Sequence, residues 1–268
     1  MPSARLTDRA VLAVTGPDAA ALLQGLVTNT VTRVTAVTPV YAALLTPQGK
    51  VQADFILFAD GAGGFLIDVA AAAADDLLKR LKLYRLRAAV ALDPRPDLHV
   101  FASWEAGDAS AAPPADPRLP ALGRRWIAEA AETDADLSAY TRHRLALGVP
   151  DTADVAGAFA LDANLDELNG LDFRKGCFVG QEVTARMKHK TEPRRRLVPL
   201  LVEGEVLRGV TVTDANGTEV GEVASTAGGR ALASLRLDRL REAEALSVDG
   251  RPARLAPLAY GLPLQTGA

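Results

Sequence analysis

Apolar positions change their spacing several times along the first hundred residues. Between residues 17 and 27 they recur at helical intervals, which predicts a helix that begins at Pro17. Apolar runs broken by glycine-containing turns predict strands over 41–45, 51–59 and 65–69, preceded by an opening strand within the first 14 residues. An alanine-rich stretch over 71–84 then predicts a helix, and 88–92 a further strand. Together these elements indicate a compact α+β unit.

The middle of the chain mixes helical and extended patterns. Strands are predicted over 98–103 and 125–128, and the proline-rich segment 105–120 between them is expected to be an exposed loop. A helix over 134–147 is expected to be capped by Thr133 and ended by Gly148. A short helix over 162–168 and another that opens at Val179 or Gly180 complete this part.

The last 70 residues have the pattern of a small all-β domain. Turn-favouring pairs such as Asn216-Gly217 and Asp249-Gly250 separate short apolar runs. The runs that we expect to be strands are 197–202, 210–213, 219–225, 231–235 and 253–257. This spacing predicts a small antiparallel barrel or sandwich.

The most distinctive stretch is Lys175-Gly-Cys-Phe-Val-Gly-Gln-Glu182, which contains the only cysteine of the 268 residues. Two glycines and the preceding Arg174 and Lys175 provide backbone amides and positive charge that could stabilise a Cys177 thiolate. A helix that begins just after Cys177 would add to this effect. The alternative is that Cys177 is a small buried hydrophobe and that the glycines form a turn.

This octapeptide, followed by Val-Thr-Ala-Arg, resembles the signature of the YgfZ-type folate-binding proteins, which are related to the glycine-cleavage T-protein (aminomethyltransferase). Weaker similarity covers 23–29, Gln48-Gly49-Lys50 with Asp54, and 144–150. The resemblance implies an α+β fold with three domains around a central channel. A discontinuous first domain (1–36 and 97–193) would carry the signature, 37–96 would form an inserted α+β domain, and 194–268 a C-terminal β-barrel.

The resemblance also implies site residues. Lys175 and Cys177 would be the functional pair, supported by Gly176, Gly180, Gln181 and Glu182. Asp54 matches the acid that faces the folate amine in T-proteins, although Lys50 and Ala53 replace a glycine and an acid of that motif, and Arg144 lies in a segment that places an arginine near folate. Alternation along 51–59 puts Asp54 on a largely apolar face opposite Val51, Ala53 and Phe55. A surface acid and a helix-surface arginine are the alternatives.

Composition limits the classes of function. No apolar run approaches the ~20 residues of a membrane span, and the first residues lack a secretory signal. A single cysteine suits a reducing compartment. We therefore expect a cytoplasmic protein without a membrane partner. Cys177 and three scattered histidines, His99, His143 and His189, do not provide the ligands of a stable metal site or cluster. A net charge of −3 makes nucleic acid an improbable partner.

Three functions are compatible with the sequence. The preferred one is what the resemblance to the YgfZ-type proteins implies: a tetrahydrofolate-binding protein that supports assembly or repair of iron-sulfur enzymes through Cys177, with folate and iron-sulfur enzymes or assembly proteins as partners. The alternative is a folate-dependent aminomethyltransferase, and whether the protein is a non-catalytic accessory factor or a one-carbon transferase stays open. A third is an RNA-binding module that uses a basic run, although only 5% of residues are aromatic. The run comprises Arg186, Lys188, His189, Lys190, Arg194, Arg195 and Arg196.

Overall fold

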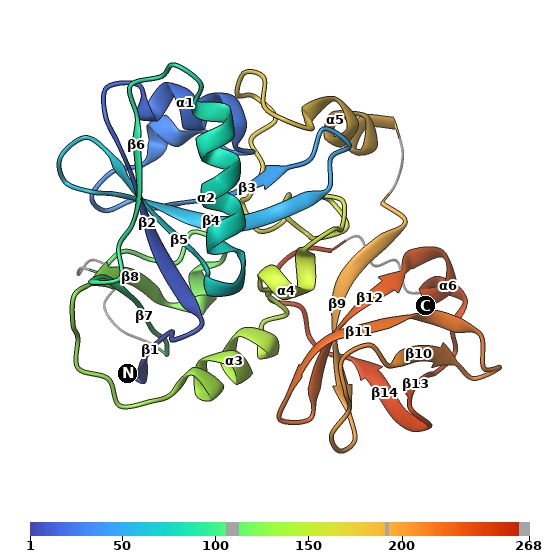
Figure 1. The fold of residues 1–268 in the computed structure, drawn as a ribbon. Helices are drawn as coiled ribbons and strands as arrows, with labels where there is room; N and C mark the ends of the chain where they lie inside the picture. The colour runs from blue at the N-terminus through green and yellow to red at the C-terminus, as the bar shows by residue number, and fades with distance from the viewer. Residues whose placement is uncertain (106–112, 191–192, 263–268) are drawn as a thin grey trace.

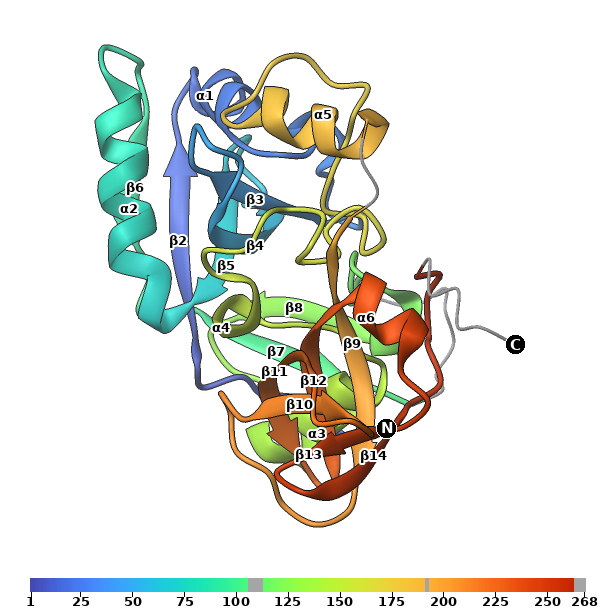
Figure 2. The ribbon, with the colours of Figure 1, turned by 90° about the vertical axis from the view of Figure 1, so that its right-hand side faces the viewer.

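The computed structural model describes residues 1–105, 113–190 and 193–262, except the side chain of Lys190. Within these ranges the strands form a five-stranded sheet, a three-stranded sheet and a closed barrel (Figure 1). The barrel lies at one end of the molecule and the five-stranded sheet with its helices at the other (Figure 2).

The five-stranded sheet has the antiparallel order β3-β4-β5-β2-β6. Its strands are β2 (Arg9–Thr15), β3 (Val40–Leu45), β4 (Val51–Ala59), β5 (Phe65–Ala70) and β6 (Ala91–Pro94). Since β2 pairs with β5 and β6, the sheet combines strands from both sides of the expected division at residue 36. That division stays a prediction.

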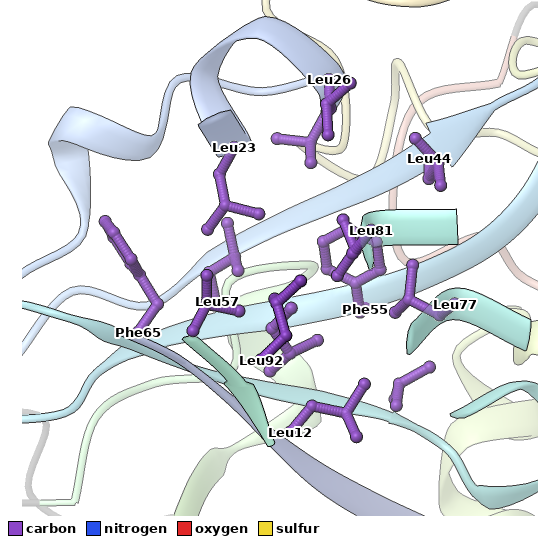
Figure 3. Close-up of a cluster of buried hydrophobic side chains, with 14 of the residues drawn as sticks. Leu12, Leu23, Leu26, Leu44, Phe55, Leu57, Phe65, Leu77, Leu81 and Leu92 are labelled. Atoms are coloured by element: carbon purple, nitrogen blue, oxygen red, sulfur yellow. The ribbon is translucent and has the colours of Figure 1, made fainter. Parts of the chain in front are cut away.

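Helices α1 (Ala19–Leu26) and α2 (Ala71–Arg85) bury one face of this sheet. In Figure 3, Leu23 and Leu26 of α1 and Leu77 and Leu81 of α2 lie around Phe55 of β4. A fully buried side chain of this size contributes about 1.5–3 kcal/mol through the hydrophobic effect. These contacts make the helix-covered face a core of the protein.

The other face of the sheet packs against the rest of the chain. A second apolar cluster joins Tyr41 and Ile56 of the sheet to Leu145, Leu168 and Phe178 from the middle of the chain. Both faces are therefore buried, as the sequence predicted for the strand that carries Asp54. One detail differs from the expected alternation: Val51 belongs to this second cluster, because a β-bulge lies between it and Ala53.

The chain also forms a three-stranded sheet, of order β1-β7-β8, and several further helices. These elements are β1 (Ser3–Arg5), β7 (His99–Ser103), β8 (Arg124–Ala128), α3 (Leu137–Ala146), α4 (Thr152–Val155), α5 (Gln181–Lys190) and the single turns η1 (Val31–Arg33) and η2 (Pro120–Leu122). The cluster of Trp104 and Tyr140 with Ala4 and Val100 packs α3 onto this sheet.

The C-terminal strands close into an antiparallel barrel of order β10-β11-β12-β9-β14-β13, which is one of the two architectures that the turn spacing predicted and the one that the resemblance implied. The strands are β9 (Arg195–Val202), β10 (Thr211–Asp214), β11 (Glu219–Ala227), β12 (Arg230–Arg236), β13 (Leu246–Val248) and β14 (Arg251–Leu255), and α6 (Leu237–Glu242) follows β12. The short β13 and α6 were not predicted, since each has only a few apolar positions.

Other elements differ in their limits. Helix α3 is capped by Asp136, whose carboxylate accepts from the Ala139 amide, so Thr133 is not the cap. Residues 162–168 form successive turns rather than a helix. The predicted opening strand is two strands, β1 and β2, and the strand expected over 88–92 is β6, which begins at Ala91. Part of the predicted loop, residues 106–112, lies outside the described ranges.

Candidate functional site

The signature segment lies in an extended loop that leads into α5 and packs beside α1. Cys177 is exposed, which excludes its interpretation as a buried hydrophobe. The neighbouring Lys175 is only 8% exposed, and its ammonium donates to three backbone carbonyls. These acceptors are the oxygens of Gln24 at 2.7 Å, Val27 at 2.5 Å and Asn29 at 3.2 Å.

Lys175 therefore fixes the loop to the C-terminal end of α1. Its three N–H donors meet the carbonyls of Gln24 and Val27, which lie at the end of the helix, and the carbonyl of Asn29 just after it. Burial lowers the pKa of Lys175 to about 8, while Asp172 opposes this shift. Across the described ranges no hydrogen bond or ion pair joins Lys175 to Cys177, so activation of the thiol by Lys175 stays a prediction.

Asp172 makes a second attachment of the loop. Its carboxylate accepts from the Thr30 hydroxyl at 2.6 Å and pairs with Arg33 at 2.8 Å. It also accepts from the amide of Arg174 at 2.8 Å. The segment just after 23–29 thus lies against the residues that precede Cys177, which brings two of the similar segments together.

Gly180 packs closely against the turn between β3 and β4 at the start of α5. Its φ of +80° belongs to the left-handed region, and a Cβ there would lie 2.5 Å from the carbonyl oxygen of Thr46. Gly176, beside the cysteine, has open space around it. Glu182 is exposed and pairs with Arg186 one turn along α5 at 2.9 Å, and Gln181 begins the helix.

Asp54 is buried beneath α4. One carboxylate oxygen accepts from the Tyr41 hydroxyl at 2.9 Å and the other from the Thr152 hydroxyl at 2.5 Å. Burial, followed by repulsion from Asp151, raises the pKa of this carboxyl. With an exposure of 2%, Asp54 is not a surface acid.

Tyr41 links Asp54 to the signature loop. Its backbone carbonyl accepts from the side-chain amide of Asn29 at 2.9 Å, while its hydroxyl donates to Asp54. Asn29 in turn provides a carbonyl to Lys175 and donates to the carbonyl of Asn169. A continuous set of hydrogen bonds therefore connects the two sequence-predicted sites.

A buried set of charged residues next to Asp54 was not predicted. Asp68 of β5 accepts from Arg9 of β2 at 2.7 Å and from Arg125 of β8 at 2.6 Å. Burial alone would raise the pKa of Asp68, but the two guanidinium groups hold it below its usual value. The signal in the sequence was a charged residue at a core-facing position of an apolar strand, Phe-Leu-Ile-Asp68-Val.

This set extends toward α3 and α4. Arg9 also donates to Asp151 at 2.9 Å, and Arg125 shares the Tyr140 hydroxyl with Arg118. Arg118 forms a bidentate pair with Asp116. Hence guanidinium and carboxylate groups alternate between the sheets and fix the segment that covers Asp54.

Arg144 is also internal, with an exposure of 5%. Its guanidinium donates to the carbonyl of Val149 at 2.6 Å and to Asp154 at 3.2 Å. It is therefore not a helix-surface arginine. These bonds fix the ends of the segment that contains Asp151 and Thr152.

The basic run does not form one surface, because it divides between α5 and β9. Lys188 pairs with Asp166 at 3.0 Å, and Arg196 is buried against the same carboxylate at 2.6 Å. Arg195 donates to the carbonyl of Ser234. The side chain of Lys190 and residues 191–192 lie outside the described part.

In the part of the chain that the structure describes, no three His, Cys, Asp or Glu side chains gather as ligands for a metal ion. None of the described helices has the length and apolar character of a membrane span. A pterin would fit Asp54 only in part: each carboxylate oxygen keeps a second acceptor position, but α4 covers the side chain.

Known proteins with similar structures define the fold. Residues 194–259 match the family model described as the CAF17 C-terminal beta-barrel domain. A crystal structure of the glycine cleavage system aminomethyltransferase T from Bartonella henselae superposes with a TM-score of 0.75 at 15% identity, covering 98% of this chain and 85% of that one. The predicted α+β, T-protein-like fold with a C-terminal barrel is thereby confirmed.

Sequence relatives define the family. The iron-sulfur cluster assembly factor IBA57 of Homo sapiens is 33% identical over 278 residues, which covers 88% of this chain and 78% of that protein. The IBA57 homolog of Neurospora crassa is 37% identical over 235 residues, or 74% of this chain and 53% of the relative. The chain thus spans about half the length of the fungal relatives that it matches.

One prediction is wrong on this comparison. These relatives are named as mitochondrial proteins, which contradicts the expected cytoplasmic location. Composition and a single cysteine indicate a reducing environment, and they do not distinguish one such compartment from another. The identity and coverage shared with the human protein place this chain in the IBA57 family.

Proposed function

We propose that this protein takes part in iron-sulfur cluster assembly and that the Cys177 thiol makes the reactive contact. The observation that carries the proposal is the exposure of Cys177 on a loop held by Lys175, Asp172 and Gly180. An exposed thiol on a fixed loop can contact a second protein without the loss of conformational entropy that ordering a flexible loop would cost. The relatives' name as assembly factors supports iron and sulfide as the cargo.

The signature supports the YgfZ-type branch for this chain. In that reading, the thiolate of Cys177 donates an electron pair to an iron ion as a transient ligand, which needs no oxidant, and Lys175 positions the loop. Gly176 leaves room for close approach, since a Cβ at this position would meet no atom within 4 Å beyond its chain neighbours. Iron-sulfur enzymes or assembly proteins are the proposed partners.

Tetrahydrofolate or a derivative is the proposed small ligand. The free acceptor positions of Asp54 suit the N–H groups of a pterin, and α4 must shift for the ligand to reach them. Arg144 would affect folate binding indirectly. It holds the segment that covers Asp54 through its bonds to Val149 and Asp154. When bound, folate would supply one-carbon chemistry or a structural contact.

The decisive experiment measures iron-sulfur enzyme activities in aerobically grown cells that lack this protein. These cells receive either the wild-type protein or Cys177→Ala, and cells that keep their own protein are the reference. We expect the wild type to restore these activities and Cys177→Ala, at equal abundance, to fail. Restoration by both proteins would refute the role of the thiol. If the deletion leaves the activities unchanged, the assembly function itself is refuted.

Folate binding is tested separately by calorimetric titration of the purified protein with tetrahydrofolate. We expect saturable binding to the wild type and about 10- to 100-fold weaker binding to Asp54→Asn, because a hydrogen bond to a charged acceptor contributes about 1.5–3 kcal/mol. Formation of methylenetetrahydrofolate from an aminomethyl-lipoyl carrier would instead favour aminomethyltransferase activity.

A further inference from the structure

A cavity of about 660 Å³ lies between α2, β4 and α4, and none of the described signature residues 175–182 lines it. Its volume falls in the range of about 300–1,000 Å³ that is usual for small-molecule sites. The wall is mainly apolar, with six alanines and the side chains of Leu44 and Leu77. The small alanine side chains leave the space that larger residues would fill.

Gln52 gives the cavity a polar group. It lines the wall, and its Oε1 atom is buried without a hydrogen-bond partner among the described residues. A buried acceptor without a partner is unfavourable unless a donor reaches it. The unpaired amide oxygen is thus an observation separate from the cavity volume.

The backbone around Gln52 is also irregular. Leu44 pairs with Ala53 and Leu45 pairs with Val51, which leaves Gln52 as the extra residue of a β-bulge. Bulges commonly redirect a side chain beside a functional site. The irregularity is local, because the neighbouring pairs keep normal register.

The rim of the cavity carries cations from α2. Lys79 pairs with Asp76 at 3.1 Å, whereas Arg80 is exposed and has no ion pair or hydrogen bond within the described ranges. A free guanidinium presents paired donors that match a carboxylate. The rim therefore favours an anionic group.

We propose that this cavity binds a small, largely apolar organic acid that carries an N–H or O–H group at its buried end. The buried donor would meet Gln52 Oε1, the apolar body would contact the alanines, and the carboxylate would pair with Arg80. Thr152 lines the cavity and donates to Asp54, so the two sites share one residue. This site does not depend on the proposed function.

The probe is indole-3-acetate, which combines a ring N–H, an apolar body and a carboxylate. We expect saturable shifts of the ¹³C-labelled alanine methyl signals, centred on Ala53, Ala73 and Ala153, in an NMR titration of the whole chain. Indole lacks the carboxylate, and 1-naphthylacetate lacks the N–H. Each should bind about fivefold to tenfold more weakly, because it loses one hydrogen-bonded group.

Three pairs of measurements test the assigned contacts. Ala72→Trp should abolish binding by filling the cavity, whereas Ala71→Trp, on the exposed helix surface outside the wall, should retain it. Arg80→Glu should weaken the binding of indole-3-acetate about tenfold and leave the binding of indole unchanged, with Lys82→Glu as the matched control. Gln52→Leu should make indole-3-acetate and 1-naphthylacetate bind equally.

The proposal is overturned by dissociation constants above about 1 mM for all three probes. It is equally overturned if Ala72→Trp binds like the wild type or if the shifted methyl groups lie outside the wall. Binding of indole-3-acetate without any binding of tetrahydrofolate would uphold this site and refute the folate proposal.

Discussion

Lys175 illustrates how a single side chain can hold a functional loop. Its ammonium serves three carbonyls of the segment 24–29, and the cysteine two residues later stays exposed. We expect Lys175→Met to lower the free energy of unfolding by about 1.5–3 kcal/mol, since buried carbonyls lose a charged donor. Urea denaturation measures this loss, and Lys175→Arg should recover part of it. An unchanged midpoint of urea denaturation for Lys175→Met would contradict the attachment of the loop by Lys175.

The same variant tests whether the lysine also acts on the thiol. If Lys175 only positions the loop, the pH midpoint of Cys177 alkylation is unchanged in Lys175→Met. A higher midpoint would show that its charge stabilises the thiolate. This readout separates the two roles because global stability does not determine a thiol pKa.

At the scale of elements, the signature loop depends on the turn between β3 and β4. Gly180 approaches Thr46 closely and has a positive φ, so Gly180→Ala adds both a steric contact and backbone strain of about 1–2 kcal/mol. We expect a lower melting temperature and faster proteolysis of the loop. Gly176→Ala is the matched control, since open space surrounds Gly176. Equal effects of the two changes would contradict this account.

The local pattern of apolar and turn-forming residues predicted most of the helices and strands. It did not predict which of these elements contact one another. The spacing of turns and apolar runs predicted β4 with its observed limits and most strands of the barrel. The cap of α3 was misplaced because Thr133 and Asp136 are both good capping residues, and tertiary contacts decide between them. The attachment of Lys175 to Asn29 joins residues 146 positions apart, a contact that a single sequence does not reveal.

The residues of the candidate site were predicted from a resemblance to a family signature and not from the periodicity of apolar and polar positions. Cys177 and Asp54 came from a resemblance, and the structure adds their exposure and burial. Asp68, Arg9 and Arg125 were missed, since each charged residue has its partner on a strand that is distant in the sequence. Buried ion pairs of this kind are visible only after the strands are assembled.

At the scale of the whole molecule, Asp68 holds the two sheets together. It binds Arg9 within the five-stranded sheet and Arg125 on β8 of the three-stranded sheet, and it is fully buried. We expect Asp68→Asn to lower the free energy of unfolding at pH 7 by about 3–5 kcal/mol, because two buried guanidinium groups lose their counter-charge. Thermal unfolding monitored by circular dichroism measures the effect. Asp97→Asn, in the exposed pair with Arg95, should leave the melting temperature unchanged.

The pH dependence gives this prediction a second readout. The pKa of Asp68 is lower in the folded protein than its usual value of 3.8, so its carboxylate stabilises the fold above that pH. As the pH falls from 3.8 through the folded pKa, protonation removes this contribution. Stability of the wild type should therefore fall more steeply with acid than that of Asp68→Asn, which has no charge to lose there. Parallel pH profiles for the two proteins would show that Asp68 does not provide the electrostatic link between the sheets.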